Sequence, residues 1–220
     1  GEGEETMKEL LGLIATHGLR SDKLSDLKGI AFHIDDYVKI MPRRDFIKDI
    51  DSIPFPARDL IANNTFSNII TSRGCPYKCI FCASVEFWGK PRFHSAEYVV
   101  EEIEQMINKY KAVHISIWDD LFIADKPRLE SICKLIQRKK INKKISFGCA
   151  LRSNLIDPEI CELLKKINVK RISFGFETGS QKILDFLKCG SVTIEQHIKA
   201  VKLCKSYGFF TTGTFMLGNP

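Results

Sequence analysis

Three cysteines lie close together in the segment 75–82, in the pattern Cys-x3-Cys-x2-Cys. Thiolates packed this closely in one loop can converge on a single centre built from a soft metal. Three ligands leave one coordination position open, and an open position on an iron–sulfur cluster is where a substrate or cofactor can bind. The spacing therefore predicts that Cys75, Cys79 and Cys82 hold a catalytic iron–sulfur cluster.

Other interpretations of these cysteines remain open at this point. A Cys-x2-Cys pair is common in zinc sites, which usually take four ligands from paired motifs, and no second pair or His-x3-His motif follows here. A disulfide framework is disfavoured, because the chain is too large and too rich in apolar residues to need one. The remaining cysteines stand in apolar stretches and are expected to be small core residues. They are Cys133, Cys149, Cys161, Cys189 and Cys204.

Composition indicates one globular domain with an appendage. The chain has 220 residues, of which 44% are hydrophobic and 27% charged. The net charge of +6 comes from basic residues in different segments, which disfavours a nucleic-acid partner. No apolar run is long enough to span a bilayer, and no signal peptide opens the chain. Eight cysteines without a secretory signal indicate a reducing compartment, so we expect a cytoplasmic protein.

The first 67 residues differ in pattern from the rest. Residues 6–18 place apolar side chains at helical spacing, and two β-prone runs within residues 29–40 flank a polar turn, which predicts a small hairpin. Residues 41–67 hold three of the eight prolines and are expected to form a linker. The chain begins at Gly1 and stops at Pro220 directly after an apolar run, so both ends are expected to be cuts through a longer protein.

From residue 68 onward, β-prone and helical segments alternate, which favours a parallel sheet with helical crossovers. Polar residues directly follow successive strands, including the cysteine loop, Asp119, Arg152 and Glu177. In a β/α barrel these strand ends meet at one mouth, whereas a doubly wound sheet would use only one or two of them. The barrel is therefore favoured. The expected strands are 68–72, 113–118, 145–150, 171–176 and 209–217.

Together these motifs resemble the radical S-adenosylmethionine (radical SAM) superfamily. The cysteine loop, with Phe81 before its last cysteine, resembles the loop after the first barrel strand of that family. Residues 175–180, Gly-Phe-Glu-Thr-Gly-Ser, resemble the segment after the fourth strand. Residues 119–122, Asp-Asp-Leu-Phe, resemble the segment of a subgroup with an N-terminal cobalamin-binding domain. Residues 1–6 resemble the last loop of that domain, and residues 53–58 resemble its linker.

The resemblance implies an α/β fold, a partial TIM-type (β/α)6 barrel with about five β/α units in this segment. Residues 1–67 would be the end of the preceding cobalamin-binding domain with a linker and the small hairpin. Residues 68–220 would be a radical SAM core, truncated at its C-terminus. Cobalamin, bound by a domain outside this segment, is a further candidate cofactor.

The resemblance also implies roles for single residues. Cys75, Cys79 and Cys82 would hold three irons of a [4Fe–4S] cluster, and the amino and carboxylate groups of SAM would bind the fourth. A low-potential cluster would cleave SAM to a 5′-deoxyadenosyl radical that acts on an unknown substrate, for methyl transfer or ring formation. The electron would come from a low-potential donor such as flavodoxin or ferredoxin.

Four further residues would contact SAM. Phe81 would lie near the adenine, Glu177 would bind the ribose or amino group, Arg152 would meet the carboxylate, and Asp119 would complete the set. Each charged residue has an ordinary alternative: a surface salt bridge for Arg152, a carboxylate at a helix N-terminus for Glu177, and a helix cap for Asp119. Two alternative functions also stay open, a non-catalytic iron–sulfur or zinc-binding scaffold and an RNA-modifying radical SAM relative.

Overall fold

A computed structural model describes residues 2–19, 21–61 and 67–218. The chain divides into two compact units, Gly1–Ile53 and Pro54–Pro220, which are described separately. The sequence predicted a division after residue 67, whereas residues 54–61 here belong with the second unit. That the first unit forms the end of a cobalamin-binding domain stays a prediction.

The first unit contains the helix and the hairpin that the sequence predicts. Helix α1 spans Glu4–His17 and ends at Gly18. Strands β1 (Ala31–Ile34) and β2 (Tyr37–Ile40) pair antiparallel across a two-residue turn. Two short helical segments complete the described part of this unit. They are α2 (Ser21–Leu24) and η1 (Ile50–Ser52).

Five parallel strands form the sheet of the second unit, in the order β3-β6-β7-β8-β9. The order follows the chain without reversal, as in a β/α barrel, whereas a doubly wound sheet reverses its order at a switch point. The predicted barrel type is therefore confirmed. The strands are β3 (Asn68–Ile69), β6 (His114–Ile117), β7 (Ser146–Leu151), β8 (Val169–Glu177) and β9 (Phe210–Phe215).

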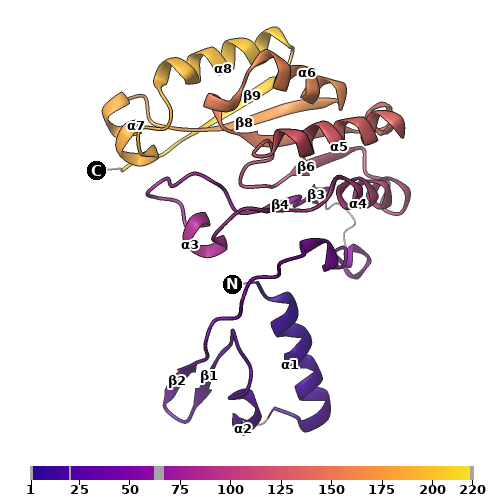
Figure 1. Cartoon of the computed structure of the whole chain (residues 1–220), viewed down its shortest axis with the longest axis vertical. Helices are drawn as coiled ribbons and strands as arrows, with labels where there is room; N and C mark the ends of the chain where they lie inside the picture. The colour runs from indigo at the N-terminus through magenta and orange to yellow at the C-terminus, as the bar shows by residue number, and fades with distance from the viewer. Residues whose placement is uncertain (1, 20, 62–66, 219–220) are drawn as a thin grey trace. The chain divides into compact units, whose positions relative to one another are not determined.

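Helices cover one face of this sheet, where α4, α5, α6 and α8 lie (Figure 1). Side-chain caps begin several of these helices: Ser95 and Asp157 accept hydrogen bonds from the main chain of α4 and α6, and Thr193 forms a capping box with Gln196 in α8. The helices are α3 (Ser84–Trp88), α4 (Ala96–Asn108), α5 (Lys126–Arg138), α6 (Pro158–Lys166), α7 (Gln181–Lys188) and α8 (Ile194–Ser206), with the short turns η2 (Arg58–Leu60), η3 (Ile141–Lys143) and η4 (Ser153–Leu155).

The two faces of the sheet carry different side chains, because successive residues of a strand point to opposite faces. Ile115, Phe147 and Phe174 point to the helices and are at most 1% exposed in one apolar core. The other face carries small and polar side chains and the large ring of Trp118 around a cavity of about 390 Å³. Its lining includes Ser116, Trp118, Gly148, Ala150 and Ser173.

The first strand differs from the prediction. Residues 68–72 were expected to form one strand, but β3 ends at Ile69. Ser72 and Arg73 form a separate strand, β4, which pairs antiparallel with β5 (Arg92–Phe93). Asp119 accounts for this break, because its carboxylate accepts hydrogen bonds from the main-chain N–H groups of Thr71 and Ser72, and the N–H of Thr71 is therefore not available to continue the parallel ladder with β6.

Four of the five cysteines outside the loop are buried, as predicted: Cys133, Cys149, Cys161 and Cys204. The prediction was wrong for Cys189, which is exposed. Cys189 follows the last residue of α7 with a φ of 52°, so it lies in the surface turn that ends the helix rather than on the apolar face. No helix in the described ranges has the length and apolar character needed to cross a bilayer.

A buried ion pair fixes the start of the second unit to the barrel. Arg58 Nη2 lies 2.5 Å from Glu102 Oε1 in α4 and donates to the carbonyl oxygen of Asn68 at 2.9 Å. Arg58 is 6% exposed and Glu102 is 3% exposed. Burial raises the pKa of Glu102, although Arg58 opposes that shift. Each charge therefore depends on the other, because an unpaired buried charge is strongly unfavourable.

We expect Arg58→Met to lower the free energy of unfolding by about 3–5 kcal/mol, because it leaves Glu102 buried without a partner. Urea-induced unfolding measures this. A matched control is Lys139→Met, which breaks the half-exposed pair between Lys139 and Glu104 (2.7 Å) and should cost at most about 1 kcal/mol. Equal costs for the two variants would contradict the argument, and the double variant Arg58→Met/Glu102→Met should recover part of the loss.

Candidate functional site

Gly74 turns the chain from β4 into the cysteine loop. Its φ of 94° lies in the region that favours glycine. A Cβ at this position would lie 3.1 Å from the Cβ of Trp88 and 3.4 Å from the Cα of Pro91, so a side chain would be both strained and crowded. The loop therefore leaves the strand in one defined direction.

The three predicted ligands lie in this loop as free thiols. Cys75 and Cys79 are half-buried, and Cys82 is exposed. The main-chain N–H of Cys82 donates to the carbonyl oxygen of Cys79 at 3.1 Å, and the N–H of Ser84 donates to the sulfur of Cys82 at 3.5 Å. Burial raises the pKa of the Cys75 thiol above its ordinary value. The loop thus supplies two half-buried cysteines and one exposed cysteine.

This donor set fits a [4Fe–4S] cluster. Thiolates are the usual ligands of such clusters. In the described part of the chain, no three His, Cys, Asp or Glu side chains converge closely enough to hold one metal ion. A cubane cluster makes a different demand, because each thiolate binds its own iron at a separate corner. Three free thiols on one loop meet that demand and leave the fourth iron without a ligand from the loop.

The C-terminal turn of α7 holds the middle of the loop. The main-chain N–H of Ile80 donates to the carbonyl oxygen of Leu187 at 3.0 Å. The thiol of Cys189 donates to the carbonyl oxygen of Lys78 at 3.1 Å. The last carbonyl groups of a helix have no partner within the helix, so the loop supplies one of the donors that they need. The loop position therefore depends on α7.

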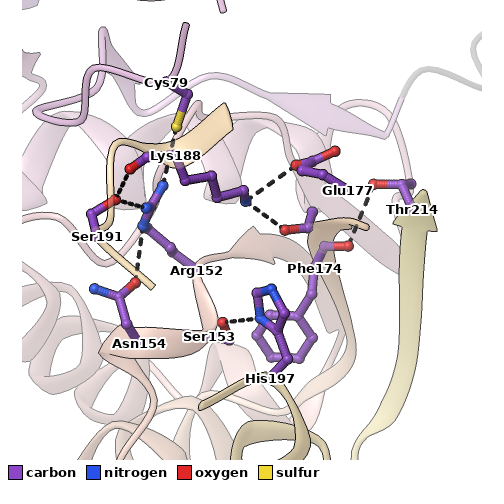
Figure 2. Close-up of polar contacts among 11 residues, drawn as sticks. Cys79, Arg152, Ser153, Asn154, Phe174, Glu177, Lys188, Ser191, His197 and Thr214 are labelled. Carbon is purple, nitrogen blue, oxygen red and sulfur yellow. Dashed lines mark hydrogen bonds and ion pairs between the residues drawn. The ribbon is translucent and has the colours of Figure 1, made fainter. Parts of the chain in front are cut away.

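Arg152, directly after β7, reaches the loop from the sheet (Figure 2). Its Nη1 donates to the sulfur of Cys79 at 3.3 Å, its Nε donates to Asn154 Oδ1 at 2.9 Å, and its Nη2 donates to the hydroxyl of Ser191. The guanidinium also lies over the ring of Tyr77, 3.8 Å from the ring centroid. Among the described residues, Arg152 therefore contacts the cysteine loop and its neighbours and does not form the surface salt bridge considered above.

Glu177 ends β8 and is buried against Lys188 (Figure 2). Lys188 Nζ lies 3.2 Å from Glu177 Oε1 and donates to the carbonyl oxygen of Gly175 at 2.6 Å. The φ of Glu177 is 65°, a conformation that is uncommon outside glycine. A Cβ on Gly175 would collide with Oε1 of Glu177, so only glycine leaves room for this carboxylate. Several constraints thus hold Glu177 in one orientation.

Asp119 lies beneath the chain that leads into the loop. It is 4% exposed, and its two carboxylate oxygens accept four hydrogen bonds from the N–H groups and hydroxyls of Thr71 and Ser72 at 2.5–3.2 Å. Burial raises the pKa of Asp119, although these hydrogen bonds oppose the shift. The neighbouring Asp120 accepts a hydrogen bond from the hydroxyl of Ser84 at 2.7 Å. Both aspartates therefore bind segments that flank the cysteine loop.

The structure thus links two of the predicted SAM contacts, Arg152 and Glu177, through the end of α7 and the turn that follows it. Arg152 binds Ser191, and Glu177 binds Lys188. Phe81 lies within the loop and is 40% exposed, so its ring remains accessible. Asp119 instead contacts Thr71 and Ser72, which lie in the chain that leads into the loop.

Sequence reasoning missed several members of the site, among them Tyr77, Lys188 and Ser191. Lys188 ends an amphipathic helix, where a basic residue is ordinary, and Ser191 lies in a polar turn. No local pattern distinguishes them, because their partners Glu177 and Arg152 lie at the ends of other elements, β8 and β7. Only the position of Tyr77 inside the cysteine loop could have drawn attention to it.

Comparison with known proteins gives the family. Residues 69–220 match the family described as the Radical SAM superfamily. An uncharacterized methyltransferase of Pyrococcus horikoshii is 32% identical over all of this chain and 48% of its own length. The anaerobic magnesium-protoporphyrin IX monomethyl ester cyclase of Rubrivivax gelatinosus is 25% identical, with 99% of this chain and 40% of the relative covered. The chain thus spans about half the length, or less, of these relatives.

A solved structure shares the fold. The cobalamin-dependent S-adenosylmethionine radical enzyme OxsB, with aqua-cobalamin and S-adenosylmethionine bound, is similar over 98% of this chain and 32% of its own. The TM-score is 0.82 and the sequence identity 23%. The predicted family and the predicted partial barrel are both confirmed.

We expect Gly175→Ala to lower the free energy of unfolding by about 1–3 kcal/mol, because its methyl group would displace the carboxylate of Glu177 from its place beside Lys188. Urea-induced unfolding of both variants measures the effect. Gly179→Ala is the matched control from the same segment, since a Cβ there meets nothing within 4 Å, and it should change stability by less than about 1 kcal/mol. A Gly175→Ala variant as stable as Gly179→Ala would show that the carboxylate is not confined.

Proposed function

Because this chain belongs to the radical SAM superfamily, we propose that Cys75, Cys79 and Cys82 hold a [4Fe–4S] cluster whose fourth iron binds SAM. Enzymes of this superfamily use both groups, so the chain is a radical SAM enzyme with these cofactors. The observation that carries the proposed ligand set is the loop itself, with three free thiols and a guanidinium against one of them. When bound, the cluster and SAM supply one-electron cleavage of a carbon–sulfur bond, which yields methionine and a 5′-deoxyadenosyl radical.

The residues around the loop would bind and orient SAM. Arg152 presents a charged fork suited to the carboxylate of SAM. Glu177, fixed by Lys188, is suited to accept hydrogen bonds from the ribose or amino group. The half-exposed ring of Phe81 would pack near the adenine. For Asp119 the hydrogen bonds favour a positioning role, because its carboxylate already accepts four of them.

The reaction that we propose for the whole protein is cobalamin-dependent methyl transfer to an unknown substrate. Two observations support this proposal. The relative from Pyrococcus horikoshii bears the name of a methyltransferase, and residues 119–122 resemble the cobalamin-associated subgroup. Ring formation is the second candidate, because the relative from Rubrivivax gelatinosus is a cyclase.

The proposed reaction requires a reductant and a substrate. We assign the first role to a low-potential electron carrier such as flavodoxin or ferredoxin, because reductive cleavage of SAM consumes one electron. All eight cysteines are free thiols, which supports a reducing compartment, and we propose the cytoplasm.

The ligand assignment is tested with anaerobically reconstituted full-length protein. Cys79→Ala should lose bound iron and sulfide, and its release of 5′-deoxyadenosine from SAM with a strong reductant should fall to the level seen without reductant. Cys189→Ser is the matched control, because Cys189 is exposed and a serine hydroxyl keeps a donor for the carbonyl oxygen of Lys78; it should keep the cluster and the cleavage. A Cys79→Ala protein with the full iron content, or a reconstituted wild type that never cleaves SAM, would refute the assignment.

The methyl-transfer proposal predicts that SAM with a deuterated methyl group passes its label to cobalamin and then to a product. Full-length protein reconstituted with cobalamin, iron and sulfide is incubated with labelled SAM, and mass spectrometry follows the label. Omission of cobalamin should stop the transfer while 5′-deoxyadenosine is still released. Release of 5′-deoxyadenosine with cobalamin present and no label on cobalamin would instead favour ring formation or another radical reaction.

A further inference from the structure

We propose that Arg152 sets the reduction potential of the cluster through its hydrogen bond to the sulfur of Cys79. The inference rests on the proposed function, because it takes Cys79 as a cluster ligand. It goes beyond the binding of SAM, because it assigns Arg152 a role before SAM arrives. In this role Arg152 is a positioning and tuning residue.

The contact itself is direct. Nη1 of Arg152 lies 3.3 Å from the sulfur of Cys79, within the range for an N–H donor to sulfur, and Figure 2 shows the guanidinium directed at that sulfur. Arginine keeps its charge at every relevant pH. Cys79 is half-buried, so water screens this contact less than it would at an open surface.

Three neighbours hold the guanidinium in place. The ring of Tyr77 stacks on it at 3.8 Å, Asn154 accepts from Nε at 2.9 Å, and Ser191 accepts from Nη2. Asn154 in turn donates to the hydroxyl of Tyr77 at 3.1 Å. These contacts come from the cysteine loop, from η4 and from the turn after α7. A guanidinium fixed from three sides keeps a constant direction toward Cys79.

The direction of the effect follows from charge. Reduction adds one negative charge to the cluster and its thiolates. A hydrogen bond and a positive charge at a ligating sulfur stabilise the more negative state, and hydrogen bonds to sulfur are among the factors that set cluster potentials. Arg152 therefore raises the potential and makes the cluster easier to reduce.

The proposed role leaves Arg152 free to meet SAM as well. A guanidinium has five N–H donors, and Cys79, Asn154 and Ser191 take three of them. The remaining donors are available for the carboxylate of SAM. A measurement without SAM isolates the effect on the cluster.

The test is a redox titration of the reconstituted full-length protein without SAM, followed by electron paramagnetic resonance. In Arg152→Gln, the ratio of reduced to oxidised cluster at a fixed poise should fall about tenfold, which is roughly 59 mV for one electron. Arg138→Gln removes the same charge at the exposed last turn of α5 and should leave the ratio within about twofold of the wild type.

Two further variants keep the test decisive if Arg152→Gln does not assemble the cluster. Arg152→Lys keeps the charge but lacks the planar fork and the stacking on Tyr77, so its potential should fall by less than that of Arg152→Gln. Ser191→Ala keeps Arg152 and all three ligands and removes one of its three supports, so a smaller fall in the same direction is expected.

Wild-type potentials in Ser191→Ala and in whichever Arg152 variant assembles the cluster would overturn the inference. That result differs from failure of the proposed function, which would appear as a Cys79→Ala protein that keeps its full iron and sulfide content. Lower potentials in the Arg152 variants, with normal iron content and a normal Arg138→Gln control, would support it.

Discussion

The position of the cysteine loop depends on the carboxylate of Asp119. One of its oxygens accepts hydrogen bonds from the N–H groups of Thr71 and Ser72 at 2.5 and 3.2 Å, so the N–H of Thr71 does not continue the parallel ladder with β6. The chain therefore leaves the sheet after β3 and pairs with β5 instead. A buried carboxylate with four donors is stable in this place, because each donor offsets part of its desolvation. The cysteine loop then begins at Gly74, directly after β4.

The end of α7 and the turn that follows it contact the cysteine loop, so this one segment positions several parts of the site. Leu187 and Cys189 bind the main chain of the loop, Lys188 binds Glu177, and Ser191 binds Arg152. A displacement of this turn would move the thiols, the carboxylate and the guanidinium together. The predicted cluster ligands and the predicted SAM contacts are therefore connected to one another through protein contacts.

The sequence could predict the parts of this arrangement that have a local signature. The cysteine spacing and the polar residues after each strand are such signatures, and they led to the barrel and the family. The end of β3 could not be predicted, because local β-propensity does not reveal a carboxylate 48 residues away from Thr71. The partners of Arg152 and Glu177 were missed for the same reason, since Cys79 lies 73 residues before Arg152. Local patterns identified which residues matter, and tertiary contacts decide what they touch.

The two faces of the sheet differ: one packs against the helices in the apolar core, and the other borders the cavity. In a filled β/α barrel, bulky branched side chains occupy the interior. Here Gly148, Ala150 and Ser173 stand on the inner face, and the hydroxyl of Ser173 pairs with that of Thr212 at 2.8 Å. Their small size leaves the cavity of about 390 Å³, while the buried core lies between the strands and the helices. The inner face of the sheet therefore stays open, while its outer face packs against the helices in the apolar core that stabilises the fold.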